Sequence, residues 1–217
     1  GVLAGFGLFF IGIDFLKNAF EGISTGIDLE NQTLPGIAGV LMYLAIGFLM
    51  TLFTQSSSAA IAITLTAATG GVLTLEAAAA MVIGANVGTT STAGFAVIGA
   101  TPNAKRVASA HVIFNLLTGF VALLILPLLF LIIQYAGNFL QLGDHPAVTL
   151  ALFHTLFNIL GVALMWPLSR KLSKFLQHRF RSTEEIESTV RYIDNTVLVA
   201  PPLALNALYL ELDHVAE

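Results

Sequence analysis

The chain has 217 residues, of which 56% are hydrophobic and only 10% are charged. Soluble globular domains usually carry about 25% charged residues, so this composition excludes an ordinary water-soluble domain. The formal net charge of −4 identifies no class of partner, because the charges gather in a few short islands. The chain contains no cysteine, which excludes disulfide bonds and thiolate metal sites within it.

Four long windows of the sequence lack any Asp, Glu, Lys or Arg. They cover residues 31–75, 77–104, 107–143 and 146–169, and a further apolar run, Gly1–Ile13, opens the chain. A helix that crosses a hydrocarbon core of about 30 Å needs about 20 apolar residues. We therefore predict an all-α membrane protein, a helical bundle with several spans embedded in a lipid bilayer.

Two of these windows are expected to contain broken or re-entrant helices. Residues 31–75 would form a straight helix of about 67 Å, roughly twice the hydrocarbon thickness, and the credible break is the polar stretch Thr51–Ser58. A second interruption is expected at Gly84–Thr92, where two glycines and a run of hydroxyl residues favour unwound backbone or helix caps. Irregular backbone at membrane depth persists where it lines a protein-enclosed cavity, so the breaks predict a polar site. Spacing alone leaves open whether residues 31–104 cross fully or re-enter.

Two later segments, Val107–Ile133 and Ala147–Pro167, are each long enough for a plain crossing. The loop between them, Gln134–Pro146, has no Lys or Arg, whereas basic residues precede the first segment and follow the second. The basic clusters are Lys105 and Arg106 before the first segment, and Arg170, Lys171, Lys174, Arg179 and Arg181 after the second. Because basic residues gather on the cytoplasmic side of membranes, we predict both clusters in the cytoplasm and the loop outside.

The polar residues of the first break form the strongest candidate for a binding site: Gln55, Ser56, Ser57 and Ser58. Consecutive hydroxyl residues compete with the hydrogen bonding of a helical backbone. At a helix break they offer oxygen ligands to a hard cation, and hydroxyl protons and free backbone amides to an anion. The alternative role is hydrogen bonding between packed helices.

The second polar stretch is expected to supply side-chain oxygens opposite the first, from Asn86, Thr89 and Thr90. The alternative is helix capping, and the two roles are compatible. The stretch GANVGTT lacks the lysine of a phosphate-binding P-loop and follows no strand, which disfavours nucleotide binding.

A short internal repeat places the same polar residues on both later segments. The sequence His111-Val-Ile-Phe-Asn-Leu-Leu is repeated as His154-Thr-Leu-Phe-Asn-Ile-Leu, so His111 and Asn115, like His154 and Asn158, share one helix stripe. These residues are either ligands in a relay or, as we favour, hydrogen-bonding residues at a helix interface. The matched stripes are expected to face each other.

An enzymatic function is disfavoured. Ser57, His111 and Asp14 have the residue types of a hydrolase triad, but no G-x-S-x-G motif accompanies the serine. The sequence also lacks H-E-x-x-H and similar metal-hydrolase spacings. We therefore expect no catalytic residues.

The order of motifs resembles one known family. TQSSSA is followed after about 25 residues by GANVGTT, then by KRVASAHVIFNLLTG and HTLFNILG. In this order, from about Gly5 to Trp166, the motifs resemble the bacterial branch of the sodium-dependent phosphate cotransporter family. The resemblance implies two inverted repeats with one QSSS motif each. This chain holds one such motif and is similar to the second repeat, which implies one half of an inverted-repeat transporter.

The resemblance also implies a division of the chain and a function. Residues 1–170 correspond to the transmembrane repeat, and residues 171–217 to a cytoplasmic basic linker and the start of a PhoU-like helical domain. Both ends of the chain suggest a fragment of something longer. The implied function is sodium-coupled symport of inorganic phosphate in the plasma (inner) membrane, by a multi-pass protein with a cytoplasmic C-terminus. The implied partner is the first repeat or a second copy of the chain in a dimer, and no nucleic acid.

The site residues implied by the resemblance follow the two motifs. Gln55 and Ser56–Ser58 match the substrate and sodium motif, and Asn86, Thr89 and Thr90 match its partner motif. Sodium is expected at Gln55, Ser56–Ser58 and Asn86, as a co-transported ion, with no organic cofactor. Two alternatives stay open: a sodium-coupled carrier of another small oxyanion, and a membrane sensor that couples phosphate binding to a cytoplasmic helical domain.

Overall fold

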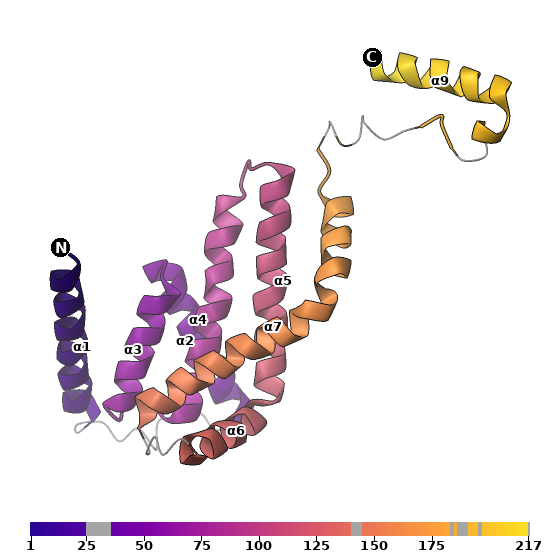
Figure 1. The fold of residues 1–217 in the computed structure, drawn as a ribbon. Helices are drawn as coiled ribbons and strands as arrows, with labels where there is room; N and C mark the ends of the chain where they lie inside the picture. The colour runs from indigo at the N-terminus through magenta and orange to yellow at the C-terminus, as the bar shows by residue number, and fades with distance from the viewer. Residues whose placement is uncertain (25–35, 140–144, 183–184, 186–190, 195–196, 217) are drawn as a thin grey trace.

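The computed structural model describes the chain except for residues 25–35, 140–144, 183–184, 186–190, 195–196 and 217. In the part described, every regular element is a helix (Figure 1). The elements are α1 (Val2–Ser24), α2 (Gly36–Thr54), α3 (Ser57–Thr69), α4 (Leu75–Ala96), α5 (Pro102–Leu124), α6 (Leu126–Phe139), α7 (Pro146–Arg179), the short 3-10 helix η1 (Val197–Val199) and α9 (Pro201–Ala216). Four of them, α1, α2, α5 and α7, are long and apolar enough to cross a membrane. The predicted all-α membrane protein is confirmed.

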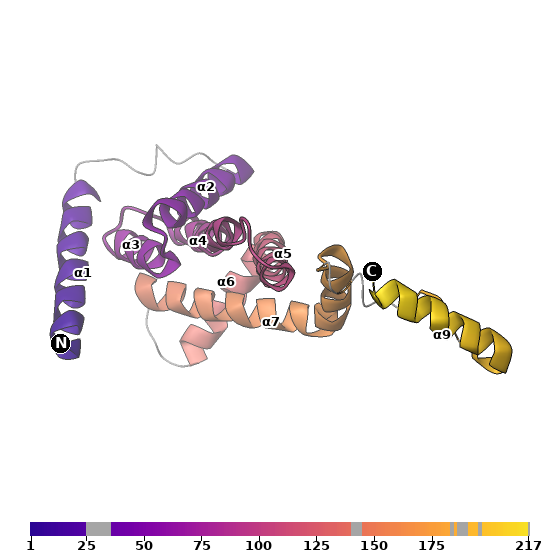
Figure 2. The same ribbon diagram turned by 90° about the horizontal axis from the view of Figure 1, so that it is seen from above.

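The central element of the bundle is α4, which packs against α2, α3, α5 and α7 (Figure 2). Residues 77–85 of this helix are all buried. Most of them are alanines or β-branched residues, which lets four neighbours approach closely on different sides. A helix buried on all sides shows no apolar stripe, because it has no solvent face to distinguish.

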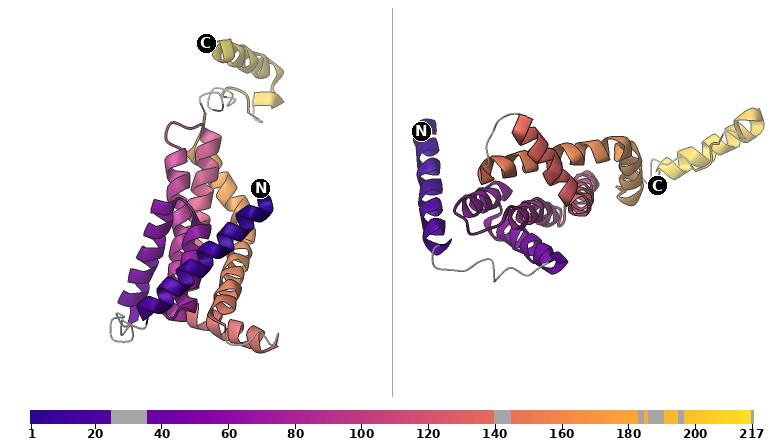
Figure 3. Two further views of the ribbon diagram at one scale, coloured as in Figure 1. Left: turned by 90° about the vertical axis from the view of Figure 1, so that its left-hand side faces the viewer. Right: turned by 90° about the horizontal axis from the view of Figure 1, so that it is seen from below.

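The predicted break in the first window is confirmed, and the two helices around it form a hairpin. Helix α2 ends at Thr54 and α3 begins at Ser57. The hairpin returns to the end of the bundle from which it came, and its tip stops short of the loop between α4 and α5 (Figures 1 and 3). The polar residues of the tip are therefore held beside the middle part of the bundle.

The second predicted interruption is wrong, because α4 is one continuous helix from Leu75 to Ala96. Its glycines serve close packing instead of a break. A Cβ atom on Gly84 would overlap the carbonyl oxygen of Leu44 in α2, and a Cβ atom on Gly88 would lie 2.7 Å from Cβ of Thr51. Small residues at such positions let the backbones of membrane helices touch.

The hydroxyl run in α4 is also compatible with an unbroken helix. Thr89, Thr90, Ser91 and Thr92 each donate a hydrogen bond to the carbonyl oxygen three residues earlier, at 2.6–2.7 Å. These bonds satisfy the hydroxyl protons within the helix itself, so the run needs no unwound backbone.

The two later spans differ from their predicted bounds. The window Val107–Ile133 is divided, because α5 ends at Leu124 and α6 turns away across the end of the bundle (Figures 1 and 3). Pro127 explains the division, since it has no N–H to donate to the helix and its ring disfavours the continuing turn. Helix α7 extends past the predicted end at Pro167, and it bends in the half that contains this proline.

The two basic clusters lie at the same end of the bundle, which we call the basic end. Helix α5 starts there and the last turns of α7 reach it, whereas α6 and the start of α7 lie at the opposite end (Figure 1). At the opposite end the rings of Phe130, Phe153 and Phe157 stack in series, with centroids 5.8 Å and 6.4 Å apart, and hold α6 on α7. Both basic clusters therefore share one end of the bundle, as two successive crossings require, and the side of the membrane that this end faces stays a prediction.

The contact between α2 and α4 gives a first prediction. Gly84→Ala should lower the free energy of unfolding by about 1–3 kcal/mol, because the new methyl group must push two backbones apart. Gly94→Ala in the same helix is the matched control, since a Cβ atom there meets nothing within 4 Å. This control should be neutral or stabilising by up to about 1 kcal/mol. Thermal unfolding in detergent, followed by circular dichroism, compares the two, and equal melting temperatures would contradict the packing.

Candidate substrate and ion site

The hairpin tip is built around a residue with unusual backbone geometry. Gln55 has a φ of 56°, in the left-handed region that residues other than glycine rarely adopt. For such a residue this conformation costs about 1–2 kcal/mol. It reverses the chain within two residues, so that α3 can fold back beside α2. A strained residue of this kind, found at a polar tip, is typical of a functional site.

Ser56 holds the start of α3 as its N-cap. Its Oγ atom accepts a hydrogen bond from the backbone N–H of Ala59 at 3.2 Å. The hydroxyl of Thr54 donates to the carbonyl oxygen of Met50 at 2.7 Å and accepts from the N–H of Ser56 at 3.3 Å. The first N–H groups of a helix have no acceptor within it, so those of Ser57 and Ser58 can donate to an anion.

Helix α4 brings the second polar set to the level of the tip. Thr51 of α2 is buried and touches Gly88, and α2 and α4 run in the same direction (Figure 1). Gln55 therefore lies one helical turn, about 6 Å, beyond this contact along the bundle. Asn86, Thr89 and Thr90 are half-buried residues of the same part of α4. The packing of Thr51 on Gly88 thus brings the two motifs within about two helical turns of each other along the bundle.

The polar groups of α4 present acceptors. Asn86 uses its Nδ2 atom to donate to the carbonyl oxygen of Val82 at 3.0 Å, which leaves its Oδ1 atom for a ligand. The hydroxyl protons of Thr89 and Thr90 are donated within the helix, so their oxygen lone pairs remain. Such oxygens suit a hard cation better than an anion.

The two histidines of the internal repeat lie in different places. His111 lies beside the candidate set, with Nε2 at 3.3 Å from Oγ1 of Thr89. His154 instead lines a pocket of about 530 Å³ between α1, α3 and α7, together with Ser58 and Lys17. The matched stripes therefore do not bring the two histidines into one pocket.

The asparagines of the internal repeat form hydrogen bonds within their own helices. Asn115 is buried and donates to the carbonyl oxygen of His111 at 3.0 Å, and Asn158 is exposed and donates to that of His154 at 2.7 Å. A role between helices stays a prediction for these side chains.

One residue of the Ser58 pocket was not expected from the sequence. Lys17 forms a local ion pair with Glu21, at 3.6 Å, but it also lines the pocket that contains Ser58. No sequence spacing predicts this, because α1 and α3 are brought together only by the packing of the bundle. Among the residues described, no group of three or more His, Cys, Asp or Glu side chains is placed to hold a metal ion.

Comparison with known proteins gives a family and several relatives. The family model described as Na+/Pi-cotransporter matches residues 31–176. "Putative inorganic phosphate export protein YjbB" of Escherichia coli K12 is 27% identical over 205 residues, which cover 93% of this chain and 36% of that protein. "Uncharacterized protein YqeW" of Bacillus subtilis is 32% identical over 168 residues, 76% of this chain and 52% of that protein. "Sodium-dependent phosphate transport protein 2B" of Homo sapiens is 35% identical over 95 residues, 42% of this chain and 14% of that protein.

The chain thus spans about a third to a half of the length of these bacterial relatives. No solved structure matches it.

The geometry of Gln55 gives a second prediction. The Gln55→Gly variant should have a free energy of unfolding about 1 kcal/mol higher than that of Gln55→Ala. Glycine removes the strain of the left-handed backbone, and the backbone entropy that glycine loses on folding offsets only part of this gain. Both variants lack the side-chain amide and should bind substrate and ion equally poorly. Chemical denaturation in detergent measures the first difference. Equal stability of the two variants would show that position 55 is not left-handed.

Proposed function

Because this chain belongs to the Na+/Pi-cotransporter family, we propose that it forms one half of a sodium-coupled carrier of inorganic phosphate. The observation that carries the proposal is the hairpin tip, where Gln55–Ser58 reverse the chain and open the N-terminus of α3 beside α4. A helix N-terminus with serine hydroxyls is suited to hold an anion, and the neighbouring neutral oxygens are suited to hold a cation. The role is carriage of a solute, with no covalent chemistry.

Charge balance explains why a cation is needed. Residues 31–104, which contain both motifs, hold no Lys, Arg or His. Placing a charge at membrane depth costs at least about 2.5 kcal/mol on insertion scales. A helix N-terminus supplies only about half an elementary charge, whereas phosphate carries one to two negative charges. Co-bound sodium supplies the remainder in the proposed mechanism.

The proposed roles follow the hydrogen-bonding state of each group. Ser57 and Ser58 donate their hydroxyl protons and backbone N–H groups to phosphate. Gln55 and Asn86 give amide oxygens to sodium, and the hydroxyl oxygens of Ser56–Ser58 complete its ligand set. Thr89 and Thr90 add lone pairs from α4, since their protons are already donated within the helix.

The half-site needs a complement to enclose a solute. Inverted-repeat carriers hold their substrate between two halves, near the middle of the membrane. The proposed complement is a first repeat with its own QSSS motif or an antiparallel second copy of this chain. Residues 1–170 then act as the transporter repeat, and residues 171–217 lead into a helical domain of PhoU type. The proposed location is the inner membrane, with inward sodium movement driving phosphate uptake.

A sensor function is the second candidate, and one contact favours it. Arg106 in α5 forms an ion pair with Glu185, which lies in the segment after the last membrane helix. A sensor would use such a contact to report phosphate binding to a cytoplasmic domain. Uptake of radiolabelled phosphate into sealed vesicles separates the two functions, because a sensor binds phosphate without accumulating it.

The third prediction concerns sodium. Phosphate affinity of the intact transporter should collapse when choline replaces sodium, and phosphate should tighten sodium binding by the same factor. Ser57→Ala should weaken both ligands without changing the melting temperature. Thr155→Ala is the matched control, since this exposed hydroxyl donates within α7 to the carbonyl oxygen of Ala151. Equal phosphate affinities in sodium and choline buffers, measured by calorimetry, would contradict the mechanism.

The fourth prediction concerns orientation. The labelling of a single introduced cysteine is easily interpreted, because this chain contains no cysteine of its own. A cysteine at exposed Arg179, at the basic end, should react with an impermeant maleimide only after the cells are permeabilised. A cysteine at exposed His145, at the opposite end, should react in intact cells. The reverse pattern would place the basic end outside.

A further inference from the structure

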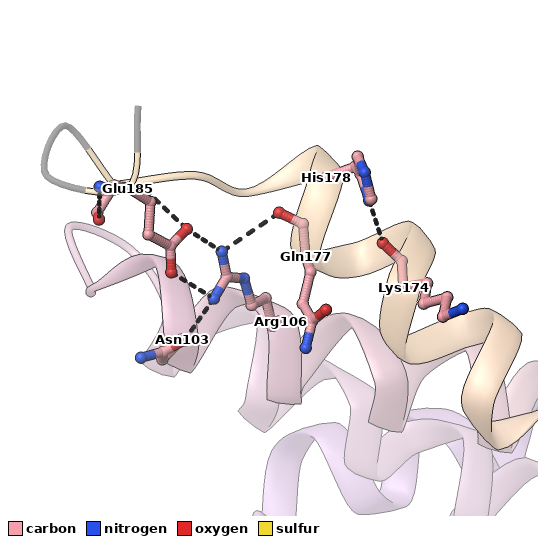
Figure 4. Close-up of polar contacts among 7 residues, drawn as sticks. Asn103, Arg106, Lys174, Gln177, His178 and Glu185 are labelled. Carbon is pink, nitrogen blue, oxygen red and sulfur yellow. Dashed lines mark hydrogen bonds and ion pairs between the residues drawn. The ribbon is translucent and has the colours of Figure 1, made fainter. Parts of the chain in front are cut away.

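Arg106 forms several polar contacts at the basic end of the bundle (Figure 4). Its side chain is 14% exposed, and its guanidinium group holds three partners from separate parts of the chain. Nη1 donates to Oδ1 of Asn103 at 2.7 Å and to Oε1 of Glu185 at 2.9 Å. Nη2 donates to Oε2 of Glu185 and to the carbonyl oxygen of Gln177 at 3.3 Å. The carboxylate of Glu185 is thus gripped at both of its oxygens.

The two members of the ion pair differ in exposure. The Glu185 side chain is 44% exposed, three times as much as Arg106. The guanidinium of Arg106 lowers the pKa of the Glu185 carboxyl, so the ion pair is complete at neutral pH. The Nε atom of Arg106 is buried and has no acceptor among the residues described. The guanidinium is held by the hydrogen bonds of its two Nη atoms, and the carboxylate does not use its Nε proton.

Two adjoining pockets give access to this guanidinium. The smaller, of about 260 Å³, is lined by Arg106 and Glu185 together with Gln177, His178 and Arg181. The larger, of about 620 Å³, runs between α5 and α7 from Arg106 to His111, with Ser169 and Ser173 on its α7 side. The lining of this pocket continues past His111 to Phe114, and His111 touches Thr89 of the candidate half-site.

We propose that Arg106 is the centre of a second oxyanion site, at the basic end, which binds phosphate-type anions and which Glu185 occupies in their absence. The planar fork of a guanidinium fits a carboxylate and a phosphate with the same paired hydrogen bonds. Glu185 is then a tethered competitor of the anion. Arg181, in the same pocket, adds a positive charge that a multiply charged anion uses more fully than one carboxylate does.

Inorganic phosphate is the occupant that the geometry favours over a lipid headgroup. This choice rests on the proposed function, because the larger pocket joins Arg106 to the His111–Thr89 contact of the half-site. Phosphate leaving or approaching the half-site on the basic side would pass this guanidinium. Its binding would displace the carboxylate of Glu185 from Arg106. A phospholipid headgroup has the same chemistry, so the experiment must separate the two sources.

The test is a phosphate titration of the intact protein in sodium-free choline buffer. Under this condition the half-site is expected to be empty, so its failure does not affect the result. In nanodiscs of phosphatidylcholine, Glu185→Gln should tighten phosphate binding by about two- to fivefold, the range expected for loss of an exposed ion pair. The double variant R106K/E185Q should lose this gain, because lysine keeps the charge but not the paired geometry. R170Q/E185Q, altered at an exposed arginine outside both pockets, should keep it.

Three outcomes would overturn the proposal. The first is equal phosphate affinity of the wild type, E185Q and R106K/E185Q in proteins with unchanged melting temperatures. The second is loss of the gain in R170Q/E185Q, which would indicate general attraction by the basic end. The third is loss of the gain in nanodiscs that contain phosphatidylglycerol, which would make a lipid headgroup the occupant. A gain that depends on Arg106, in a protein that shows no sodium-dependent binding, would support this site while contradicting the proposed transport function.

Discussion

The backbone contact between α2 and α4 is the constraint on which the rest of the structure depends. Gly47, Gly84 and Gly88 have no side chains, so the two helices touch at carbonyl groups and at Thr51. This contact fixes how far α2 rises along α4, and therefore the depth at which Gln55 turns the chain back into α3. A larger side chain in this contact would shift the tip relative to α4. Packing between two helices thus sets the geometry of the candidate site.

The candidate site combines one interrupted helix with one intact helix, and the two have different electrostatic properties. The interrupted side offers the N–H groups and hydroxyl protons at the start of α3, which are donors. The intact side offers oxygens whose protons, where present, are donated within α4. A site with donors on one side and acceptors on the other suits an anion and a cation bound together. Arg106 lies outside this pair of surfaces, at the basic end, where its ion pair with Glu185 joins the bundle to the following segment.

Sequence patterns predicted the elements whose cause is local. The length of the first charge-free window requires a turn, and the polar run Thr51–Ser58 is where α2 gives way to α3. The same reasoning failed for Gly84–Thr92, because glycine and hydroxyl residues have two uses that composition does not separate. They interrupt a helix where no neighbouring helix is near, and they allow close packing of a continuous helix where a second backbone lies against them. The position of Lys17 in the pocket that contains Ser58, and the pairing of Glu185 with Arg106, depend on packing between distant segments, which spacing cannot reveal.

The central claim is that the hairpin tip binds phosphate and sodium together, and chemical protection at the tip tests it most directly. The intact transporter would carry a single cysteine at position 57, in place of Ser57, and its rate of modification by a small methanethiosulfonate reagent would be measured. The account predicts that sodium and phosphate together slow the reaction, whereas phosphate with choline, or sodium with chloride alone, leaves it largely unchanged. A modification rate that is the same in all three buffers would contradict binding at this tip.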